Sequence, residues 1–367
     1  MIDLAPMKHI EVDSIRRVAY GGAGLTLGEF DSATQARGLA TTMGTAPPTG
    51  IAGLTLGGGY GWLMGKHGLA RDNLLAVEIV TSDGKLRYAN AEENGDLFWS
   101  VRGGGGKFGV VTRFDYRLHP QDLVLGGLVA HPVSRARQVF EFYREFTTAA
   151  PDELTTFAGL VPSPDGTPIV GLMVCWSGNL DEGERILKPL RAFGPPIGDL
   201  VGRIPYVEMQ KLLDAPPGPL CGYWKGGFLR ELSDGAIDAL VDSISRSPDP
   251  SSILVLEHFH GAFSRVPVNA TAFSHRASNH NVLIFSTWTD PSRTAEIIGW
   301  ARASWNVMRP FAGGGVYVNA LADDGSERIH EAYGPNYDRL RTIKRRYDPD
   351  NFFRLNQNIE PAGSVGN

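Results

Sequence analysis

Two glycine-dense segments stand out in the first third of the sequence. Residues 49–61 read Thr-Gly-Ile-Ala-Gly-Leu-Thr-Leu-Gly-Gly-Gly-Tyr-Gly, and residues 101–111 read Val-Arg-Gly-Gly-Gly-Gly-Lys-Phe-Gly-Val-Val. Of the 45 glycines in the 367-residue chain, 21 fall within residues 1–120, so the excess is local. Because glycine has no Cβ, such runs let the backbone approach a flat or anionic ligand with its N–H groups exposed. The segments predict a cofactor or phosphate site, with a pair of tight turns as the alternative.

The two common nucleotide-binding motifs do not account for these glycines. Gly104, Gly106 and Gly109 satisfy G-x-G-x-x-G, but the residues that follow, 110–114, have the pattern of a strand, whereas a dinucleotide fingerprint opens a helix. A P-loop requires Ser or Thr after its Gly-Lys pair, and here Lys66 is followed by His67. The glycine signal therefore needs another explanation.

Composition excludes several classes of protein. The chain has 35 Lys and Arg against 40 Asp and Glu, a net charge of −5, which argues against a nucleic-acid partner. Its two cysteines, Cys175 and Cys221, are too few for a disulfide framework and fit a reducing cytoplasm, with one disulfide between them as the alternative. No segment has the pattern of a signal peptide or the apolar length of a membrane span, so we expect a cytoplasmic protein with a small-molecule substrate.

Periodicity divides the chain near residue 120. Before it we expect short strands and two helices, over residues 10–13, 17–20, 25–38, 76–81, 85–88, 94–101 and 110–116. After it, helices and strands alternate. The expected helices are 134–148, 181–193, 233–246 and 291–309, and the expected strands are 153–161, 168–176, 252–260 and 281–289. A final helix is bracketed by Pro335 and Pro349.

Three stretches carry a resemblance to a known family. They are residues 50–61, residues 96–112 (Asp-Leu-Phe-Trp-Ser-Val-Arg-Gly-Gly-Gly-Gly-Lys-Phe-Gly-Val-Val-Thr), and the C-terminal segment with Tyr-Gly-Pro-Asn-Tyr at 333–337 and Tyr-Asp-Pro-Asp-Asn-Phe-Phe at 347–353. Together they resemble the berberine-bridge-enzyme-like flavoprotein oxidases, which have the vanillyl-alcohol oxidase type of fold. The resemblance implies an α+β protein with a PCMH-type FAD-binding domain over residues 1–120. It further implies a substrate domain over 121–331, an antiparallel sheet backed by helices, and a berberine-bridge segment over 332–367 that returns to the FAD domain.

The resemblance also implies that FAD is the cofactor and which residues contact it. Residues 50–61 would approach the diphosphate and flavin ring, Gly109 and Val110 would lie by the adenine, and Tyr333 and Asn336 would approach the isoalloxazine from the other side. The implied cofactor-binding residues are Thr49, Gly50, Gly53, Gly57, Gly58, Gly59, Tyr60, Gly61, Gly109, Val110, Tyr333 and Asn336.

Two departures from the family concern attachment of the flavin. Family members have a further N-terminal lobe whose glycine-rich loop carries a histidine that bonds covalently to the flavin, and this sequence begins at the strand expected after that lobe. Where members with a second covalent link carry a cysteine, this chain has Ala46. We therefore expect FAD to be bound without covalent attachment, to a site that lacks this lobe.

The resemblance points to Tyr317 and Asn319 as catalytic residues. Oxidation of an alcohol needs a base for the hydroxyl proton while a hydride leaves for flavin N5. Tyr317 matches the family's tyrosine, and on a strand it would share a face with Asn319; as a base it needs a lowered pKa, and the alternative is a core aromatic residue. We expect an FAD-dependent oxidase of a sugar or secondary-metabolite alcohol that uses O2, with a dehydrogenase, a truncated non-catalytic remnant and a flavin-free binding protein as alternatives.

Other polar clusters carry weaker signals. His258 and His260 share a strand face, but His-x-His alone is a weak metal signal, and we expect a solvated or substrate-lining face and no metal. His275 and Arg276 are predicted to be structural. The basic residues of 339–346 are predicted to form the solvated face of a helix.

Overall fold

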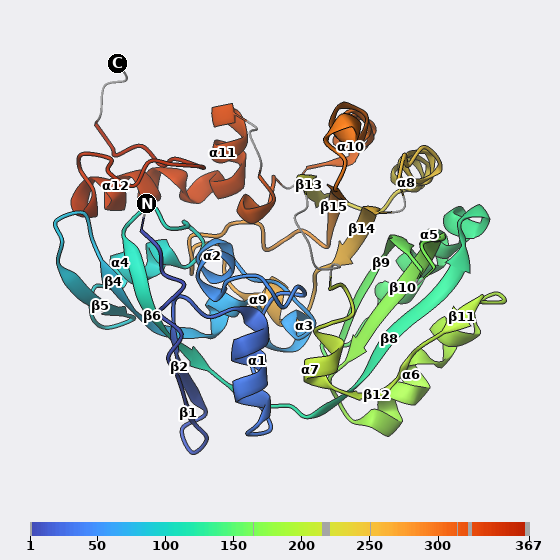
Figure 1. Ribbon diagram of the computed structural model, residues 1–367, viewed down its shortest axis with the longest axis horizontal. Coiled ribbons are helices and arrows are strands. Elements are labelled where there is room, and N and C mark those ends of the chain that lie inside the picture. The colour runs from blue at the N-terminus through green and yellow to red at the C-terminus, as the bar shows by residue number, and fades with distance from the viewer. Residues whose placement is uncertain are drawn as a thin grey trace.

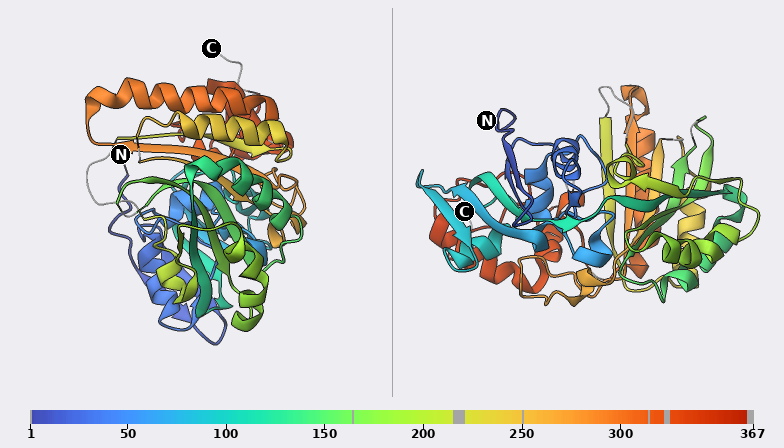
Figure 2. Two further views of the ribbon diagram at one scale, coloured as in Figure 1. Left: turned by 90° about the vertical axis from the view of Figure 1, so that its right-hand side faces the viewer. Right: turned by 90° about the horizontal axis from the view of Figure 1, so that it is seen from below.

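Two sheets lie side by side in the computed structural model, which describes residues 2–163, 165–214, 221–249, 251–313, 315–321 and 325–363. The first sheet belongs to the early part of the chain and the second to the middle, and the C-terminal helices return to the first (Figure 1). The view from below shows the same separation (Figure 2, right).

The first sheet has five antiparallel strands in the order β1-β2-β6-β4-β5. Gly84, at φ +73°, closes the tight turn of the β4–β5 hairpin, in a conformation that glycine adopts without strain. Apolar residues of the inner face, among them Val77, Ile79 and Phe114, are fully buried. The strands are β1 (Ile10–Asp13), β2 (Val18–Gly22), β4 (Leu74–Val80), β5 (Leu86–Asn90) and β6 (Val110–Arg117).

Short helices and a two-stranded ribbon surround this sheet. Helix α1 (Leu27–Gln35) starts at a capping box, in which Thr26 accepts from the Glu29 amide and Glu29 accepts from the Thr26 amide. The remaining elements are α2 (Ile51–Gly57), α3 (Met64–His67), α4 (Gly95–Val101) and the pair β3 (Leu39–Ala40) with β7 (His119–Pro120).

The second sheet is a larger antiparallel one in the order β11-β8-β10-β9-β14-β15-β13, with β12 also paired to β8. Its strands are β8 (Leu123–Pro132), β9 (Leu154–Pro162), β10 (Pro168–Trp176), β11 (Gly198–Asp199), β12 (Gly202–Pro205), β13 (Cys221–Leu229), β14 (Ser252–His258) and β15 (His280–Trp288). Near-continuous apolar runs form β9, β10 and β14 because both faces of these central strands are covered.

Helices cover one face of the second sheet. They are α5 (Ala136–Thr147), α6 (Leu180–Ala192), α8 (Asp234–Ser245) and α10 (Thr294–Met308), drawn in green, yellow and orange on the outer side (Figure 1). The opposite face meets the first half of the chain, where Phe157, Met173 and Phe228 pack with Trp62, Leu63 and Met64. The short helices α7 (Tyr206–Met209) and α9 (Ala262–Arg265) lie at this junction.

The C-terminal segment returns to the first sheet as α11 (Gly325–Tyr333) and α12 (Tyr337–Tyr347). On α12, Leu340 and Ile343 enter the core that also contains Leu97 and Trp99 of α4. The basic side chains Arg341, Arg345 and Arg346 lie on the solvent side, whereas Lys344 is buried and paired with Asp348 at 2.6 Å.

Most predicted elements are present within one to three residues, and three expectations were wrong or incomplete. Residues 317–319 are not a strand: Tyr317 precedes a single 3-10 turn, Val318–Ala320. The glycine run contains a helix, α2, which the sequence analysis did not predict. Strands β8 and β13 were also missed, because glycines at positions 126, 127, 222, 226 and 227 hide the strand pattern.

A buried carboxyl group connects α1, beside the first sheet, to the segment that follows α7, beside the second sheet. Asp31 of α1 is 1% exposed, and its Oδ2 accepts from Nε2 of Gln210 at 2.7 Å, just after α7. The other carboxyl oxygen has no hydrogen-bond partner in the described part of the chain. Burial raises the pKa of Asp31 from 3.8 to about 7, and the Gln210 hydrogen bond opposes this only in part.

This carboxyl predicts a pH-dependent stability difference. The folded chain holds the Asp31 proton up to about pH 7 and the unfolded chain releases it near pH 4, so Asp31 reduces stability as the pH rises through that window. Asp31→Asn cannot ionise, so the variant should be more stable than the parent at pH 8, by at most about 4 kcal/mol, and the gain should close towards pH 4. Thermal unfolding at pH 4.5, 6 and 8 measures this, and a variant that is less stable at pH 8 contradicts it.

Candidate functional site

The glycine run meets the segment that precedes α11 at Tyr317. Its Oη accepts from the Gly59 amide at 2.9 Å and from Nδ2 of Asn319 at 2.9 Å. Asn319 also donates to the carbonyl of Leu54 at 3.1 Å, inside α2. A Cβ at Gly57 would overlap the Asn319 side chain and one at Gly58 would overlap the Tyr317 ring, so a side chain at either position would displace Asn319 or Tyr317.

One cavity, which we call the tyrosine cavity, opens beside this contact. It has a volume of about 530 Å³. The glycine segment contributes Thr49, Gly50, Gly53 and Tyr60, and the segment before α11 contributes Tyr317 and Asn319. Trp224 of β13 and Leu283 of β15 complete the wall from the second sheet. The cavity therefore lies between the glycine run and the second sheet.

A second cavity, the glycine cavity, adjoins the first. It has a volume of about 580 Å³ and is lined by Gly105, Gly106 and Lys107 of the second glycine segment, by Val110 and Tyr333, and by residues 352–357. Gly53, Val318, Asn319 and Gln357 line both cavities.

The glycines of these walls fit a flat, extended cofactor such as FAD. A Cβ at Gly50, Gly53 or Gly106 would meet no protein atom within 4 Å, so the missing side chains leave open space over the backbone. The two adjoining cavities give an elongated site lined by both glycine segments, as a dinucleotide requires. Of the predicted cofactor residues, the cavity walls contain Thr49, Gly50, Gly53, Tyr60, Val110 and Tyr333.

The other predicted cofactor residues hold the backbone around the cavities. Gly61 packs against the carbonyl of Met43, and Gly109 packs against Val80, each too closely for a Cβ. Asn336 donates its amide to the carbonyls of Val268, Thr271 and Ala272 and lines neither cavity. Gly57, Gly58 and Gly59 lie behind Tyr317 and Asn319.

The tyrosines are protonated in this environment. Burial raises the pKa of Tyr317, and the opposing effects of the Gly59 amide, the Arg71 charge and Asn319 do not cancel it. Burial and the nearby Glu257 carboxyl raise the pKa of Tyr60 well above 10. The lowered pKa that a tyrosine base requires is therefore not found at either residue.

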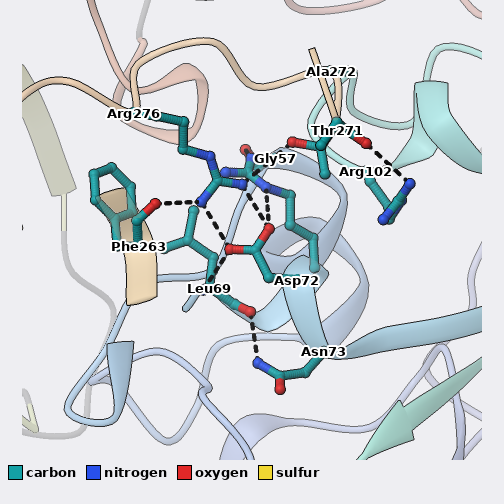
Figure 3. Close-up of polar contacts among 12 residues, drawn as sticks. Gly57, Leu69, Asp72, Asn73, Arg102, Phe263, Thr271, Ala272 and Arg276 are labelled. Carbon is teal, nitrogen blue, oxygen red and sulfur yellow. Dashed lines mark hydrogen bonds and ion pairs between the residues drawn. The ribbon is translucent and has the colours of Figure 1, made fainter. Parts of the chain in front are cut away.

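A buried ion pair lies beneath the glycine run (Figure 3). Arg276 donates to both oxygens of Asp72, at 2.8 and 2.6 Å, and also to the carbonyl of Phe263 at 3.2 Å. Both side chains are at most 7% exposed. Burial alone would raise the pKa of Asp72, but the Arg276 hydrogen bonds and charge outweigh it, and the pKa is lowered.

This pair fixes the turn that carries the glycine run. The Asp72 carboxylate accepts from the Leu69 amide at 2.8 Å, and the next two amides, of Ala70 and Arg71, donate to the carbonyls of Gly59 and Gly58. Arg71 is fully buried against the ring of Phe273, 3.9 Å from its centroid. The Nε2 of His275 lies 2.9 Å from the Ala332 carbonyl.

The two histidines with the weak metal signal lie at the end of β14 and just after it. His258 and His260 stack at 4.4 Å between ring centroids, and burial lowers the pKa of His258 to about 2. Among the described residues no group of three or more His, Cys, Asp and Glu side chains could hold a metal ion. Cys175 is buried and Cys221 is exposed, and neither forms a disulfide. In the same part of the chain, no helix is long and apolar enough to cross a membrane.

Three cavity or near-cavity residues were not predicted. Trp224 and Leu283 reach the tyrosine cavity from neighbouring strands of the second sheet, and Glu257 lies behind Tyr60. Alternation along β15 could have indicated that Leu283 faces inward, but the sequence gives no signal for which strands lie next to the glycine run.

Comparisons with known proteins agree with this geometry. Residues 1–90 match the family model described as FAD binding domain, and residues 316–360 match the one described as berberine and berberine like. An FAD-linked oxidoreductase of Dictyostelium discoideum is 31% identical over 98% of this chain and 79% of its own. The (R)-6-hydroxynicotine oxidase of Paenarthrobacter nicotinovorans is 30% identical over 99% and 82%.

Solved structures show the same fold. The 6-hydroxy-D-nicotine oxidase from Arthrobacter nicotinovorans superposes with a TM-score of 0.88 at 27% identity, over 98% of this chain and 82% of that one. A berberine bridge enzyme variant superposes with a TM-score of 0.86 at 21% identity, over 100% and 81%, which supports the fold alone. The expected architecture, a PCMH-type FAD-binding fold with antiparallel sheets and helices, is confirmed.

The open glycine positions predict that a side chain at Gly53 excludes the cofactor. Gly53 lies in α2 and lines both cavities, so Gly53→Leu should preserve the helix and fill the site. We expect the variant to fold and to lose bound FAD, measured as the flavin-to-protein absorbance ratio after reconstitution. Gly299→Leu, on the exposed side of α10, is the control and should keep the parent's flavin content.

The ion pair predicts a large loss of stability when one partner is removed. Arg276→Leu removes both short hydrogen bonds to the buried Asp72 and leaves it only the longer pair with Arg71, at 3.7 Å, so we expect a loss of about 3–5 kcal/mol in the free energy of unfolding. The control is Arg265→Leu, which removes an exposed pair with Asp152 and should cost no more than about 1 kcal/mol. Chemical denaturation measures both, and equal losses would show that burial does not set the strength of the Arg276 pair.

Proposed function

This chain belongs to the berberine-bridge-like FAD-linked oxidoreductases and uses FAD, and we propose that it oxidises an alcohol group of a sugar or secondary metabolite with O2 as electron acceptor. The observation that supports the substrate class is the polar wall of the tyrosine cavity. Tyr60, Tyr317 and Asn319 face one cavity that adjoins the glycine-lined site, so hydroxyl and amide groups are available to bind a substrate oxygen.

We assign a separate role in the site to each of three parts of the chain. Residues 1–120 would supply the glycine segments that hold FAD, residues 332–367 would close the site with Tyr333 and the 352–357 segment, and residues 121–331 would supply the substrate wall. With Ala46 in the wall of the tyrosine cavity, no thiol is present there for a covalent link, which supports noncovalent binding through that position.

Bound FAD supplies a hydride acceptor at N5 and passes the electrons on to O2. The protein binds the substrate hydroxyl, orients the carbon that carries this hydroxyl, and removes the hydroxyl proton. Tyr317 is the proposed base; because burial raises its pKa and keeps its hydroxyl protonated, it has to lose its own proton before it accepts that of the substrate. The Gly59 amide and Nδ2 of Asn319 both donate to its oxygen, so they stabilise the negative charge that develops as its proton leaves.

Asn319 acts as a positioning residue in this scheme. Its amide nitrogen donates to Tyr317 and to the Leu54 and Gly53 carbonyls, at 2.9, 3.1 and 3.3 Å. It therefore fixes the tyrosine oxygen relative to α2, which carries the glycines of the cofactor site.

The role of Tyr317 predicts the behaviour of Tyr317→Phe. The variant keeps the ring that packs on Gly58 and loses the oxygen, so we expect FAD content to stay at the parent's level and kcat to fall by about 10²–10⁴-fold. The measurement is anaerobic bleaching of the visible flavin absorbance and aerobic O2 uptake with a panel of aldoses, benzylic and allylic alcohols.

Tyr206→Phe is the matched control for this experiment. Tyr206 is fully buried in α7, and its hydroxyl has no hydrogen-bond partner in the described residues, so its loss should leave kcat unchanged. Parent-like turnover by Tyr317→Phe would rule out its role as the base. If no alcohol bleaches the flavin of the loaded parent protein but a secondary or tertiary amine does, amines replace alcohols as the proposed substrate class.

A further inference from the structure

One lysine in the wall of the glycine cavity is buried without a counter-charge. Lys107 directly follows the four glycines of the second glycine segment, is 8% exposed and lines the cavity. Its Nζ donates to the carbonyl of Leu355 at 2.6 Å, and the described residues offer it no other hydrogen bond and no carboxylate. An ammonium group has three N–H donors, so two of them have no partner in this part of the protein.

A neighbouring lysine has all the partners that Lys107 lacks. Lys344 of α12 is fully buried, and its Nζ donates to the carboxylate of Asp348 at 2.6 Å and to the carbonyls of Lys107 and Phe353 at 2.7 and 2.9 Å. Burying a charge is costly unless the charge is paired and hydrogen-bonded. The contrast between the two lysines indicates that Lys107 pairs with a charge that does not come from the described chain.

The wall of the glycine cavity is cationic. Lys107 and Arg354 both line it, and none of the described residues that line it is Asp or Glu. Burial and the charge of Lys344 lower the pKa of Lys107 from 10.5 to about 8, so this wall disfavours the ammonium form. An anion bound in the cavity would remove that penalty.

The glycines next to Lys107 leave room for an anion. A Cβ at Gly106 would meet no protein atom within 4 Å, and one at Gly105 would meet only the Tyr333 hydroxyl, at 3.9 Å. Gly105 has φ +71°, and turns with a left-handed residue can direct successive backbone N–H groups into an anion-binding concavity. Positive charge and open space over the backbone therefore occur at the same place in the cavity.

We propose that Lys107 binds the diphosphate of FAD and that Arg354, exposed on the same wall, adds a second positive charge to this anion subsite. The inference rests on the part of the proposed function that places FAD between the glycine segments, and not on the oxidation of an alcohol. Lys107 donates its two remaining N–H groups to phosphate oxygens, in charge-assisted hydrogen bonds. The diphosphate thus supplies the counter-charge that the described chain does not.

A purely structural role for Lys107 is the alternative. Its hydrogen bond to Leu355 attaches the 352–357 segment to the second glycine segment, and that attachment alone shapes the cavity. The two roles differ for a flavin that has no phosphate. Riboflavin has the same ring system as FAD, so loss of a structural tie weakens the binding of both, whereas loss of the positive charge weakens the binding of FAD alone.

Lys107→Gln separates these roles, because glutamine keeps a donor for the Leu355 carbonyl and removes the charge. We expect the Kd for FAD to rise by roughly 10- to 100-fold and the Kd for riboflavin to stay at the parent's value. Titration of the flavin-free protein, followed by flavin fluorescence, measures both constants. Lys107→Arg keeps the charge and should recover most of the FAD affinity. Added NaCl should weaken FAD binding more in the parent than in Lys107→Gln.

Lys85→Gln is the matched control. Lys85 is exposed in the turn between β4 and β5 and lines neither cavity, so both affinities should stay at the parent's values. Equal losses of FAD and riboflavin affinity in Lys107→Gln would make Lys107 structural and overturn the proposal, as would an unchanged FAD affinity.

Inorganic pyrophosphate tests the subsite in the parent protein, without any substitution. It should compete with FAD and not with riboflavin, and it should have no effect on FAD binding by Lys107→Gln. A Kd for FAD that pyrophosphate does not raise in the parent contradicts the proposal. If no alcohol bleaches the FAD-loaded parent while these affinities differ as expected, the proposed oxidation fails and the diphosphate subsite stands.

Discussion

The geometry of the site depends on one buried ion pair. Asp72 and Arg276 are 204 residues apart in sequence and meet in a region that excludes water. Arg276 lies in the loop between α9 and β15, and Asp72 holds the turn whose amides donate to the carbonyls of Gly58 and Gly59. Because Gly59 in turn donates to Tyr317, the position of the candidate base relative to the glycine run follows from this pair.

Glycine serves two separate purposes along this path. At Gly57 and Gly58 the missing Cβ lets the Asn319 and Tyr317 side chains approach the backbone, so these residues join two parts of the protein. At Gly53 and Gly106 the missing Cβ leaves space that no protein atom fills. The dense runs in the sequence therefore combine internal packing and ligand space, which explains why no single nucleotide-binding motif describes them.

The sequence predicts regular elements well where periodicity is strong, and side-chain neighbours only in part. The helices and strands over residues 134–192 and 233–309 lie close to their predicted bounds because their apolar patterns are long. Residues 317–319 were assigned to a strand because three residues carry no period, whereas Tyr317 precedes the 3-10 turn Val318–Ala320. The Asn319 side chain lies next to Tyr317 because it donates a hydrogen bond to the tyrosine oxygen. Glu257, Trp224 and Leu283 could not be placed because their neighbours depend on the order of strands in the sheet, which alternation along one strand does not encode.

The glycine cavity is walled by residues from opposite ends of the sequence, Ile2 on one side and residues 352–357 on the other. A ligand held there contacts segments that can come together only when the intervening chain has folded. Because such a ligand binds only the folded chain, its binding increases the free energy of unfolding by mass action. The thermal stability of this protein therefore depends on the concentration of FAD around it, and the cofactor stabilises the fold as well as taking part in the reaction.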